Sequence, residues 1–464
     1  MHILILNRFF DDPAAPTARM AADVARELVA RGHAVTVYCG TRAYLDGGAG
    51  ERPSSVPRPP SSGTAHGSGE ARSVTEPLTR RRTEDGGRGT GDALLRVHTL
   101  WTPRNRALAW LVFWMRMLVR VPFTPCDRIL FLTDPPFMTI AGWLAKHVRP
   151  RLKCVWWTMD LYPEALVAAG IVREGGLVER LLRRLNRLGL RAMDRVVCLG
   201  GRQAERVGHH EASSSVLRPP SSGTAHGTSE ARDATEPLTH RKTEYGGRKT
   251  VVVPPWDSRE LHHVPHAANR FRATSRLQRK HLVLYAGNLG RGHSFEEMLQ
   301  GAVALREAGR TNWHVVFVVG GARRGELTVA ARGLSNVTIH EYVAPEMMNE
   351  LMWAADVHLI TMARGFDGVI VPSKLATCLR TDAPILFIGP PESDTAREIA
   401  RHHAGASLPN DCKGEDVVAA LDRLSEAKRV PEADVSEEAV GRVVEAVVGR
   451  YPPPQPGFLT TTDG

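Results

Sequence analysis

The sequence predicts an α/β protein built from two Rossmann-like domains, each with a doubly wound parallel sheet. Short, continuously apolar runs recur along the chain, helical segments separate them, and the same alternation starts again near residue 281. Strands that are apolar on both faces are typical of parallel sheets covered by helices on both sides. We therefore expect an N-terminal domain over residues 1–255, a linker over 256–280, a C-terminal domain over 281–450 and a tail over 451–464.

The N-terminal half opens with the apolar run "HILIL", a helix from about Thr17 to Ala30 and a second run, "AVTVYC". In this helix, Met20, Val24 and Leu28 fall on one stripe, as expected where a helix packs on a sheet. The first run has no basic segment before it and no cleavage site after it, so we interpret it as a strand and not as a signal peptide. Further buried strands are predicted at "DRILFLT", "LKCVWWTMD", "DRVVCLG" and "TVVVPPW".

The C-terminal half repeats this order with five predicted strands, "HLVLYAG", "WHVVFVVGG", "NVTIH", "DVHLITM" and "PILFIG". Ser294 and Glu297 predict a capping box for the helix after the first of them, and Pro345 is expected in the first turn of a later helix. Two such domains in tandem place the carboxyl ends of two sheets around a common cleft, which is where doubly wound folds bind ligands.

A segment rich in Pro, Ser and Gly occurs twice, at residues 54–88 and 214–248, and both copies contain "RPPSSGTAH". Neither copy has the hydrophobic face that a stacked structural repeat needs. So little apolar surface cannot offset an ordering entropy of about 1 to 2 kcal/mol per residue. We expect two duplicated, disordered loop insertions, at about 52–90 and 213–249; a Pro-rich docking motif is the alternative.

The chain is basic, with a formal net charge of +10. The two copies hold eleven basic and eight acidic residues, so most of the positive charge lies in the rest of the chain. This balance favours phosphate-bearing or anionic-membrane partners. The six cysteines form no C-x-x-C or His-paired spacing, which indicates a reducing compartment and argues against a structural zinc.

A glycine-containing turn in "YAGNLGRGHSFEEM" is a candidate phosphate site. Gly287 and Gly290 allow tight backbone after a strand expected to end at Ala286, and a helix is expected from Ser294. Free N–H groups at a helix N-terminus suit a diphosphate, although an ordinary turn explains the same residues. Arg291 either adds positive charge to this site or points to solvent.

Two pairs of charged residues are candidates for chemistry. Asp367 and Lys374 flank a constrained loop in "GFDGVIVPSK". A lysine at a helix start is unfavourable by the helix dipole, so a bound anion is one interpretation and a solvated surface lysine is the other. Asp160 and Glu164 follow a strand end on the facing side of the cleft and are expected to act on an incoming hydroxyl; alternatively, Asp160 only caps a helix.

The segment "RNRALAWLVFWMRMLVRV" predicts a basic amphipathic helix, and "ERLLRRLNRLGLRAMDR" predicts another. In the first, Leu108, Leu111, Met115 and Leu118 share one stripe. Its apolar stretch is interrupted by arginines and is too short to span a bilayer. Basic amphipathic helices lie in the interface of anionic membranes, while an ordinary domain-packing helix is the alternative.

Several of these strings, "MHILIL", "MDLYPE", "VVVPPW", "YAGNLGRGHSFEEML", "VFVVGG", "DGVIVPSK" and "PILFIGPP", occur in an order that resembles glycosyltransferases of family 4. The similar branch is the one associated with bacterial surface-polysaccharide and O-antigen assembly. The resemblance implies a GT-B fold, a nucleotide-sugar donor on the C-terminal domain and an acceptor on the N-terminal domain. It also implies retention of configuration and no required metal or other cofactor.

Carried onto this sequence, the resemblance implies that Lys374 neutralises charge on the leaving diphosphate and that Asp367 contacts the donor sugar. The implied catalytic residues are Asp367, Lys374 and Asp160. The implied donor-binding residues are Gly287, Asn288, Gly290, Arg291, Ser373 and Glu392. The implied acceptor-binding residues are Arg19 and Glu164.

The sequence also departs from the family it resembles. The family's second glutamate is missing where Lys374 to Thr377 stand, and its Arg and Lys pair is absent from the first phosphate loop, which holds Asn288 and His293. The predicted function is that of a cytoplasmic, peripheral membrane glycosyltransferase of the hexosyltransferase type, with a lipid-linked or glycan acceptor and no nucleic-acid partner. The alternatives are a nucleotide-sugar epimerase with the GT-B fold and an inactive nucleotide-sugar-binding protein.

Overall fold

The computed structural model describes residues 1–12, 15–41, 94–103, 105–212, 244–245, 248–427 and 429–449. The first copy of the duplicated segment lies outside the described residues. The second copy does so too, except for the backbone of residues 244–245 and 248. The predicted tail, 451–464, also lies outside them.

The N-terminal sheet has the strand order β3-β2-β1-β4-β5-β6-β8-β7, and all its neighbours are parallel except β7 and β8. The central strand β1 pairs on both sides, with Ile3 opposite Val35 and Arg128. The strands are β1 (His2–Leu6), β2 (Ala34–Gly40), β3 (Leu95–Leu100), β4 (Arg128–Phe131), β5 (Lys153–Trp157), β6 (Arg195–Cys198), β7 (Glu244–Tyr245) and β8 (Arg248–Val252).

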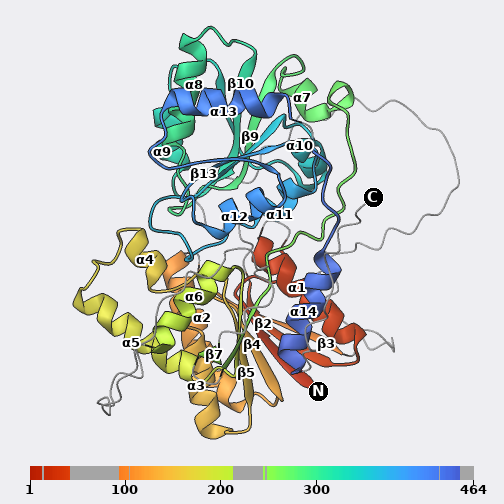
Figure 1. Cartoon of the computed structure of the whole chain (residues 1–464). Helices are drawn as coiled ribbons and strands as arrows, with labels where there is room; N and C mark the ends of the chain where they lie inside the picture. Colours follow the sequence, from red (N-terminus) through yellow and green to blue (C-terminus); the bar gives the residue numbers. More distant parts are fainter. Residues whose placement is uncertain are drawn as a thin grey trace, which may run out of the picture.

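Helices cover both faces of this sheet, and the last helix in the described part of the chain is one of them (Figure 1). On one face lie α1 (Pro16–Ala30) and α14 (Ser436–Val448), and the predicted stripe of α1 is buried there. The domain bounds predicted from the sequence assign α14 to the C-terminal domain. In the structure, however, the valines of α14 pack with Ile3 and Ile5 of β1 in the N-terminal domain. The other face carries α2 (Arg106–Arg120), η3 (Val121–Phe123), α3 (Thr139–Val148), α4 (Glu164–Ala168), α5 (Leu177–Arg191) and α6 (Gly201–Ala212).

The C-terminal sheet is parallel throughout, with the order β11-β10-β9-β12-β13-β14. Its strands are β9 (His281–Asn288), β10 (Trp313–Gly320), β11 (Val337–His340), β12 (Val357–Thr361), β13 (Ile385–Ile388) and β14 (Gly405–Leu408). One face packs on α8 (Glu296–Glu307), α9 (Arg324–Ala330) and α13 (Gly414–Ser425). The other elements are η5 (His266–Ala268), α7 (Arg270–Thr274), η6 (Pro345–Met347), α10 (Met348–Met352), α11 (Lys374–Leu379) and α12 (Asp394–Arg401).

The predicted fold class is confirmed, and every predicted strand is present. The prediction missed the edge strands β3, β14 and β7, the last of which lies within the predicted insertion 213–249. Four of the six residues of β3 are exposed, and β14 reads "GASL", so neither strand carries the apolar run that identifies a buried strand.

The predicted capping box of α8 is wrong. The helix begins at Glu296 with Phe295 in the N-cap position, and the Ser294 hydroxyl has no hydrogen-bond partner among the described residues. The Glu296 carboxylate accepts a hydrogen bond at this helix start, from the Phe295 N–H at 2.9 Å. β9 also ends later than predicted, because it stays paired with β10 as far as Asn288, two residues past Ala286. Pro345 does open its helical turn, η6, as predicted.

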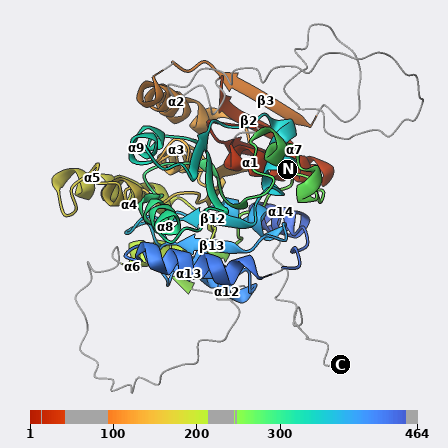
Figure 2. The ribbon, with the colours of Figure 1, turned by 90° about the horizontal axis from the view of Figure 1, so that it is seen from above.

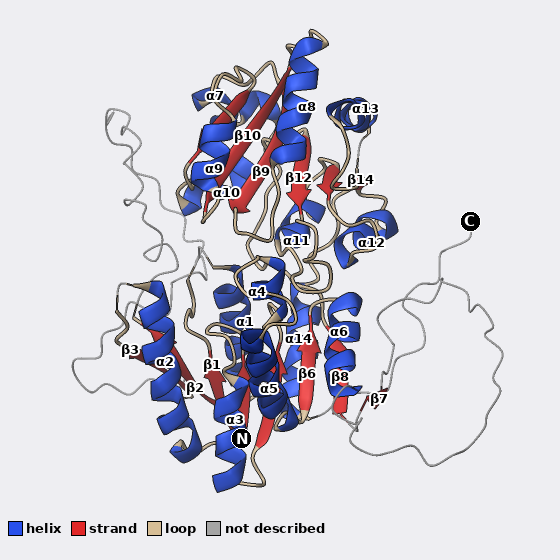
Figure 3. Ribbon diagram, turned by 90° about the vertical axis from the view of Figure 1, so that its left-hand side faces the viewer, coloured by secondary structure: helices blue, strands red, loops and turns tan. Residues whose placement is uncertain are grey.

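The carboxyl ends of the two sheets face each other, so the loops that leave them meet between the domains (Figures 1 and 3). The Leu161 N–H, after β5, donates to the Val369 carbonyl oxygen, after β12, at 3.0 Å. Leu161, Val369 and Phe366 belong to one buried apolar cluster that crosses the boundary. The two halves therefore share a hydrophobic contact beside the predicted site.

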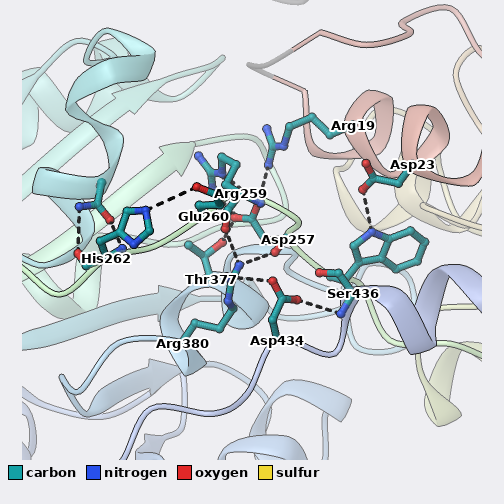
Figure 4. A network of polar contacts seen from close by, with 12 residues as sticks. Arg19, Asp23, Asp257, Arg259, Glu260, His262, Thr377, Arg380, Asp434 and Ser436 are labelled. Carbon is teal, nitrogen blue, oxygen red and sulfur yellow. Dashed lines mark hydrogen bonds and ion pairs between the residues drawn. The ribbon is translucent and has the colours of Figure 1, made fainter. Parts of the chain in front are cut away.

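A buried carboxylate ties the linker to both domains (Figure 4). Asp257, 4% exposed, accepts hydrogen bonds from the Thr377 hydroxyl of α11 at 2.5 Å and from Arg259 Nε at 2.9 Å. Arg19 of α1 lies 3.7 Å away. The linker, the N-terminal domain and the C-terminal domain thus converge on one charge.

Arg380 extends this network to the chain segment before α14. It donates to the carbonyl oxygens of Asp257 and Arg259 and forms a 2.9 Å ion pair with Asp434. Burial alone raises the pKa of Asp257, but the hydrogen bond and charge of Arg259, with the charge of Arg19, hold this pKa well below its usual range.

We predict that Asp257→Ala lowers the free energy of unfolding by about 3–5 kcal/mol at neutral pH, because it removes the buried carboxylate that Arg259, Arg19 and Thr377 share. Urea unfolding followed by circular dichroism measures this change. A lowered carboxyl pKa stabilises the fold above the unfolded-state pKa, and this contribution is lost as the pH falls, so the difference from wild type narrows in acid.

The matched control is Asp382→Ala, at an exposed aspartate just beyond α11. We expect it to change stability by less than about 0.5 kcal/mol. Equal losses in the two variants would contradict the role given to Asp257.

Candidate functional site

Lys374 and Gly287, predicted to share a site, are brought together by the fold. Lys374 is the first residue of α11, and its Cε lies 3.0 Å from the position that a Cβ on Gly287 would occupy. Its Nζ donates to the Tyr285 hydroxyl at 2.6 Å and lies 4.0 Å from the centroid of that ring. The lysine therefore lies against the end of β9, where the predicted diphosphate turn begins.

The environment of Lys374 weakens its charge. Burial lowers the pKa of Lys374 to about 7, so near neutral pH the amine is protonated in only part of the molecules. The helix-dipole argument expects an anion beside this lysine, whereas in the structure a tyrosine hydroxyl accepts its hydrogen bond. An anionic ligand at Nζ would raise the pKa again, because an opposite charge favours the protonated form.

His293, in the same turn, is neutral. Its Nδ1 lies 2.6 Å from the Thr361 carbonyl oxygen, which only accepts, so Nδ1 carries the proton. Burial, with the nearby charge of Lys374, lowers the pKa of His293 to about 3. His293 consequently offers no positive charge to a phosphate at this turn.

The rest of the turn is placed as a loop between β9 and α8. Asn288 is exposed at the strand end, and the Gly290 carbonyl oxygen accepts from the His293 N–H at 3.1 Å. Arg291 is exposed. Sequence reasoning missed Arg323, whose guanidinium lies over the Phe295 ring and donates to the His293 carbonyl oxygen at 2.7 Å.

Arg323 holds the turn from the adjacent strand loop. It also pairs with Glu296, the first residue of α8, and with Glu326 of α9. One sequence signal could have identified Arg323. It follows the glycine pair at the end of β10, and the ends of neighbouring parallel strands lie at the same edge of a sheet, so Arg323 could have been expected near the turn after β9.

Asp367 is buried at the domain boundary. Its Oδ2 accepts from Arg202 of α6, with Nη2 at 2.9 Å and Nε at 3.1 Å. Its Oδ1 is also buried and accepts no hydrogen bond from the part of the chain that the structure describes. Ser373 occupies the N-cap position of α11, and Glu392 is exposed in the loop after β13.

The predicted acceptor residues are placed on the N-terminal side. Asp160, partly buried after β5, donates its N–H to the Thr133 hydroxyl oxygen at 3.4 Å. Glu164 is buried and forms a 2.7 Å ion pair with Arg183 of α5. Arg19 faces Asp257, and burial, together with the charge of Arg259, lowers the Arg19 pKa to about 10. Arg19 and Glu164 thus both form ion pairs within the protein.

Arg8 and Asp134 form a pair that sequence reasoning missed. They follow β1 and β4, and their side chains lie 3.3 Å apart. The Arg8 guanidinium also lies 4.3 Å from the centroid of the Phe9 ring and 5.7 Å from that of Trp110 on α2. Each residue directly follows a predicted strand. Because the carboxyl ends of neighbouring parallel strands lie together, the sequence could have predicted that the two side chains are close.

Two named proteins are similar to this chain in sequence, and no family model matches it. WbjE of Pseudomonas aeruginosa, named a probable glycosyltransferase, is 24% identical over 325 residues, which cover 69% of this chain and 70% of WbjE. WcaI of Escherichia coli strain K12, named a putative colanic acid biosynthesis glycosyl transferase, is 29% identical over 104 residues. That match covers 22% of this chain and 24% of WcaI.

Solved structures resemble the chain over both domains. WaaG, a glycosyltransferase involved in lipopolysaccharide biosynthesis, has a TM-score of 0.52 at 15% identity, covering 97% of this chain and 100% of that one. The chain has the GT-B fold. A protein described as trehalose-6-phosphate from E. coli bound with UDP-2-fluoro glucose has a TM-score of 0.55 at 10% identity, covering 97% of this chain and 96% of that one.

We predict that the lowered pKa of Lys374 makes the free energy of unfolding depend on pH. Between about pH 7 and 10.5, the unfolded chain keeps the lysine proton and the folded chain releases it. The free energy of unfolding therefore rises with pH relative to Lys374→Met, with a slope of at most about 1.4 kcal/mol per pH unit. Urea unfolding at a series of pH values measures it.

Lys413→Met is the matched control, because Lys413 is exposed at the start of α13. Its stability difference from wild type is expected to stay flat over the same pH range. A flat difference for Lys374→Met as well would show that this amine keeps an ordinary pKa.

Proposed function

We propose that the protein is a glycosyltransferase that moves a sugar from a nucleoside-diphosphate donor to a lipid-linked or glycan acceptor in cell-surface polysaccharide synthesis. The GT-B fold and the sequence similarity to WbjE and WcaI support the enzyme class. The likeness to a protein bound with UDP-2-fluoro glucose supports a nucleotide-sugar donor. We infer retention of configuration and a metal-independent reaction from the family resemblance.

The observation that carries this proposal is the approach of Lys374 to the end of β9. We place the donor diphosphate at the turn from Gly287 to Gly290, with Lys374 beneath it and the sugar toward Asp367. Because burial lowers the Lys374 pKa, binding of the anionic donor recruits a proton to Nζ, and the ammonium then stabilises the charge left on the diphosphate.

The acceptor then approaches from the N-terminal side. Asp160, Arg8 and Asp134 follow strands β5, β1 and β4 at the edge that faces the C-terminal domain. We propose that Asp160 accepts a hydrogen bond from the attacking hydroxyl. The Arg8–Asp134 pair, with Phe9 and Trp110 alongside, offers polar and aromatic contacts for a sugar or a phosphate.

We predict that Lys374→Ala lowers turnover by about a hundredfold, as loss of one electrostatic group at a developing charge does. The assay supplies UDP-, GDP- and dTDP-sugars with membranes from the native host and measures sugar transfer and nucleoside-diphosphate release. Lys413→Ala, at an exposed lysine of the same domain, is expected to retain wild-type turnover.

Other outcomes separate the alternatives. Product formation from donor and water, with no need for membranes, would favour an epimerase. Donor binding by the folded protein with neither transfer nor release would favour an inactive binding protein. Unchanged turnover in Lys374→Ala would remove this lysine from the mechanism.

We also propose that α2 and α5 rest on an anionic bilayer at the cytoplasmic face of the plasma membrane. On α2, Leu108, Leu111, Met115 and Val119 are each more than half exposed and follow one line of the helix. The opposite face packs Phe113 and Met117 into the core. The predicted stripe is corrected at its end, because Leu118 is half-buried against the core and Val119 continues the exposed line.

Helix α5 also carries exposed apolar residues beside basic ones, and it projects from the molecule (Figure 2). Leu177, Val178 and Leu181 are exposed on a helix that also carries several arginines. None of the described helices is both long and apolar enough to cross a membrane. Exposed apolar residues beside cations suit interfacial binding to anionic lipid. The six free cysteines fit a reducing compartment.

We predict that the double variant Leu111→Gln, Met115→Gln lowers binding to vesicles containing phosphatidylglycerol by at least about tenfold, because it removes apolar area that lipid would bury. Co-sedimentation measures the bound fraction. The control is Val329→Gln, at an exposed valine on α9 of the other domain. Equal binding by wild type and the double variant would exclude this face as the contact.

A further inference from the structure

The first turn of α6 links the two domains through one residue, Arg202. Its guanidinium donates to Asp367 Oδ2 from Nη2 at 2.9 Å and from Nε at 3.1 Å. Its main-chain N–H lies 3.1 Å from each carboxylate oxygen of Asp394, the first residue of α12. An arginine of the N-terminal domain thus binds two carboxylates of the C-terminal domain.

The backbone on both sides is shaped for this close approach. A Cβ on Gly200 would lie 2.1 Å from Asp394 Oδ2. Gly368 has a φ of +63°, and a Cβ there would lie 2.9 Å from the Arg202 carbonyl oxygen. Side chains at these two positions would push the domains apart, so both glycines are required by the contact.

The charges around Arg202 favour this arrangement. Burial raises the pKa of Asp394, and the nearby charge of Asp367 raises it too, while the Arg202 N–H opposes the shift. The second carboxylate that contacts the guanidinium is Glu205 of α6, which accepts from Nη1 at 3.1 Å. The permanently charged guanidinium therefore binds Asp367 and Glu205, while the main-chain N–H of the same residue binds Asp394.

The carboxylate of Asp367 is only half satisfied by Arg202. Its residue is 6% exposed, its Oδ2 takes both guanidinium hydrogen bonds, and its Oδ1 has no hydrogen-bond partner among the described residues. A buried carboxylate oxygen without a donor is costly, and native structures usually supply one. A sugar hydroxyl is a donor of the right kind.

We propose that Arg202 is a positioning residue for donor recognition. It holds the Asp367 carboxylate in place through Oδ2 and leaves Oδ1 to accept a hydrogen bond from a hydroxyl of the donor sugar. Because Arg202 belongs to the opposite domain, the sugar contact is complete only when the two domains are together. This inference rests on the proposed function and assigns part of its donor specificity to the N-terminal domain.

The test separates the sugar from the nucleotide. Calorimetry measures the affinity of the full-length protein for UDP-glucose, GDP-mannose and dTDP-glucose, and for UDP, GDP and dTDP alone. Arg202→Gln is expected to weaken binding of the recognised nucleotide sugar by about tenfold or more, as loss of a charge-assisted hydrogen bond does. It should leave affinity for the parent nucleoside diphosphate within about twofold of wild type.

Two further variants distinguish positioning from a general structural role. Arg202→Lys keeps one charged donor and should recover part of the lost affinity. In the double variant Arg202→Gln, Asp367→Asn, the loss should be no greater than in Asp367→Asn alone, because Arg202 acts through Asp367. Arg423→Gln, at an exposed arginine on α13, is the matched control and should bind as wild type does.

Different outcomes would overturn the role given to Arg202 and the proposed function itself. Equal weakening of nucleotide and nucleotide sugar in Arg202→Gln, or weakening of neither, would overturn the assignment and leave the proposed function standing. Failure of the wild-type protein to bind any of the six compounds would overturn the proposed function and, with it, this assignment.

Discussion

The buried carboxylate of Asp257 is the constraint on which the arrangement of the site depends. It binds Thr377 in α11, and that helix spans only the residues Lys374–Leu379. Holding Thr377 therefore also holds Lys374, three residues earlier, against the end of β9. The same carboxylate lies beside Arg19 of α1, so the position of the lysine is set relative to both domains. A linker residue outside the proposed chemistry thus anchors the helix that carries the cation.

The two cations of the proposed donor site differ in a way that suits their roles. Lys374 is partly buried, and its pKa of about 7 lets it gain or lose a proton as an anion arrives or leaves. Arg202 stays charged at all physiological pH values and holds a carboxylate in one orientation through two nitrogen atoms. Lys374, whose charge depends on its surroundings, therefore faces the proposed diphosphate. Arg202, which is always charged, positions the carboxylate of the proposed sugar contact.

The acceptor side connects the proposed site to the outer surface through one helix. Trp110 of α2 contributes to the aromatic surroundings of Arg8 at the sheet edge. The same helix presents its exposed apolar stripe to solvent. An acceptor with a lipid anchor and a polar head would meet both features in turn. The core-facing side of α2, with Phe113 and Met117, fixes the helix on the sheet.

The sequence by itself determined which segments form buried strands and that the pattern of strands and helices occurs twice. Continuous apolar runs identified the central strands, because a strand covered on both faces must be apolar on both. Local residue patterns selected Gly287, Asp367 and Lys374 as candidates, and resemblance to a known family assigned their expected roles. Edge strands such as β3 were not predicted, because their exposed faces carry polar residues and interrupt the apolar run. The predicted cap at Ser294 was wrong because α8 begins two residues later, at Glu296, and the capping pattern alone does not fix the first helical residue.

Only the tertiary structure decided which charges meet. Arg202 and Asp367 lie 165 positions apart, and Lys374 and Tyr285 lie 89 apart. The first pair depends on how the two domains dock and the second on how α11 packs against β9 within one domain, and residue type alone does not specify a partner. Burial is likewise a property of the assembled fold, so the lowered pKa values of Lys374 and His293 appear only there. Local sequence encodes apolar periodicity, whereas electrostatics acts through space between residues that folding brings together.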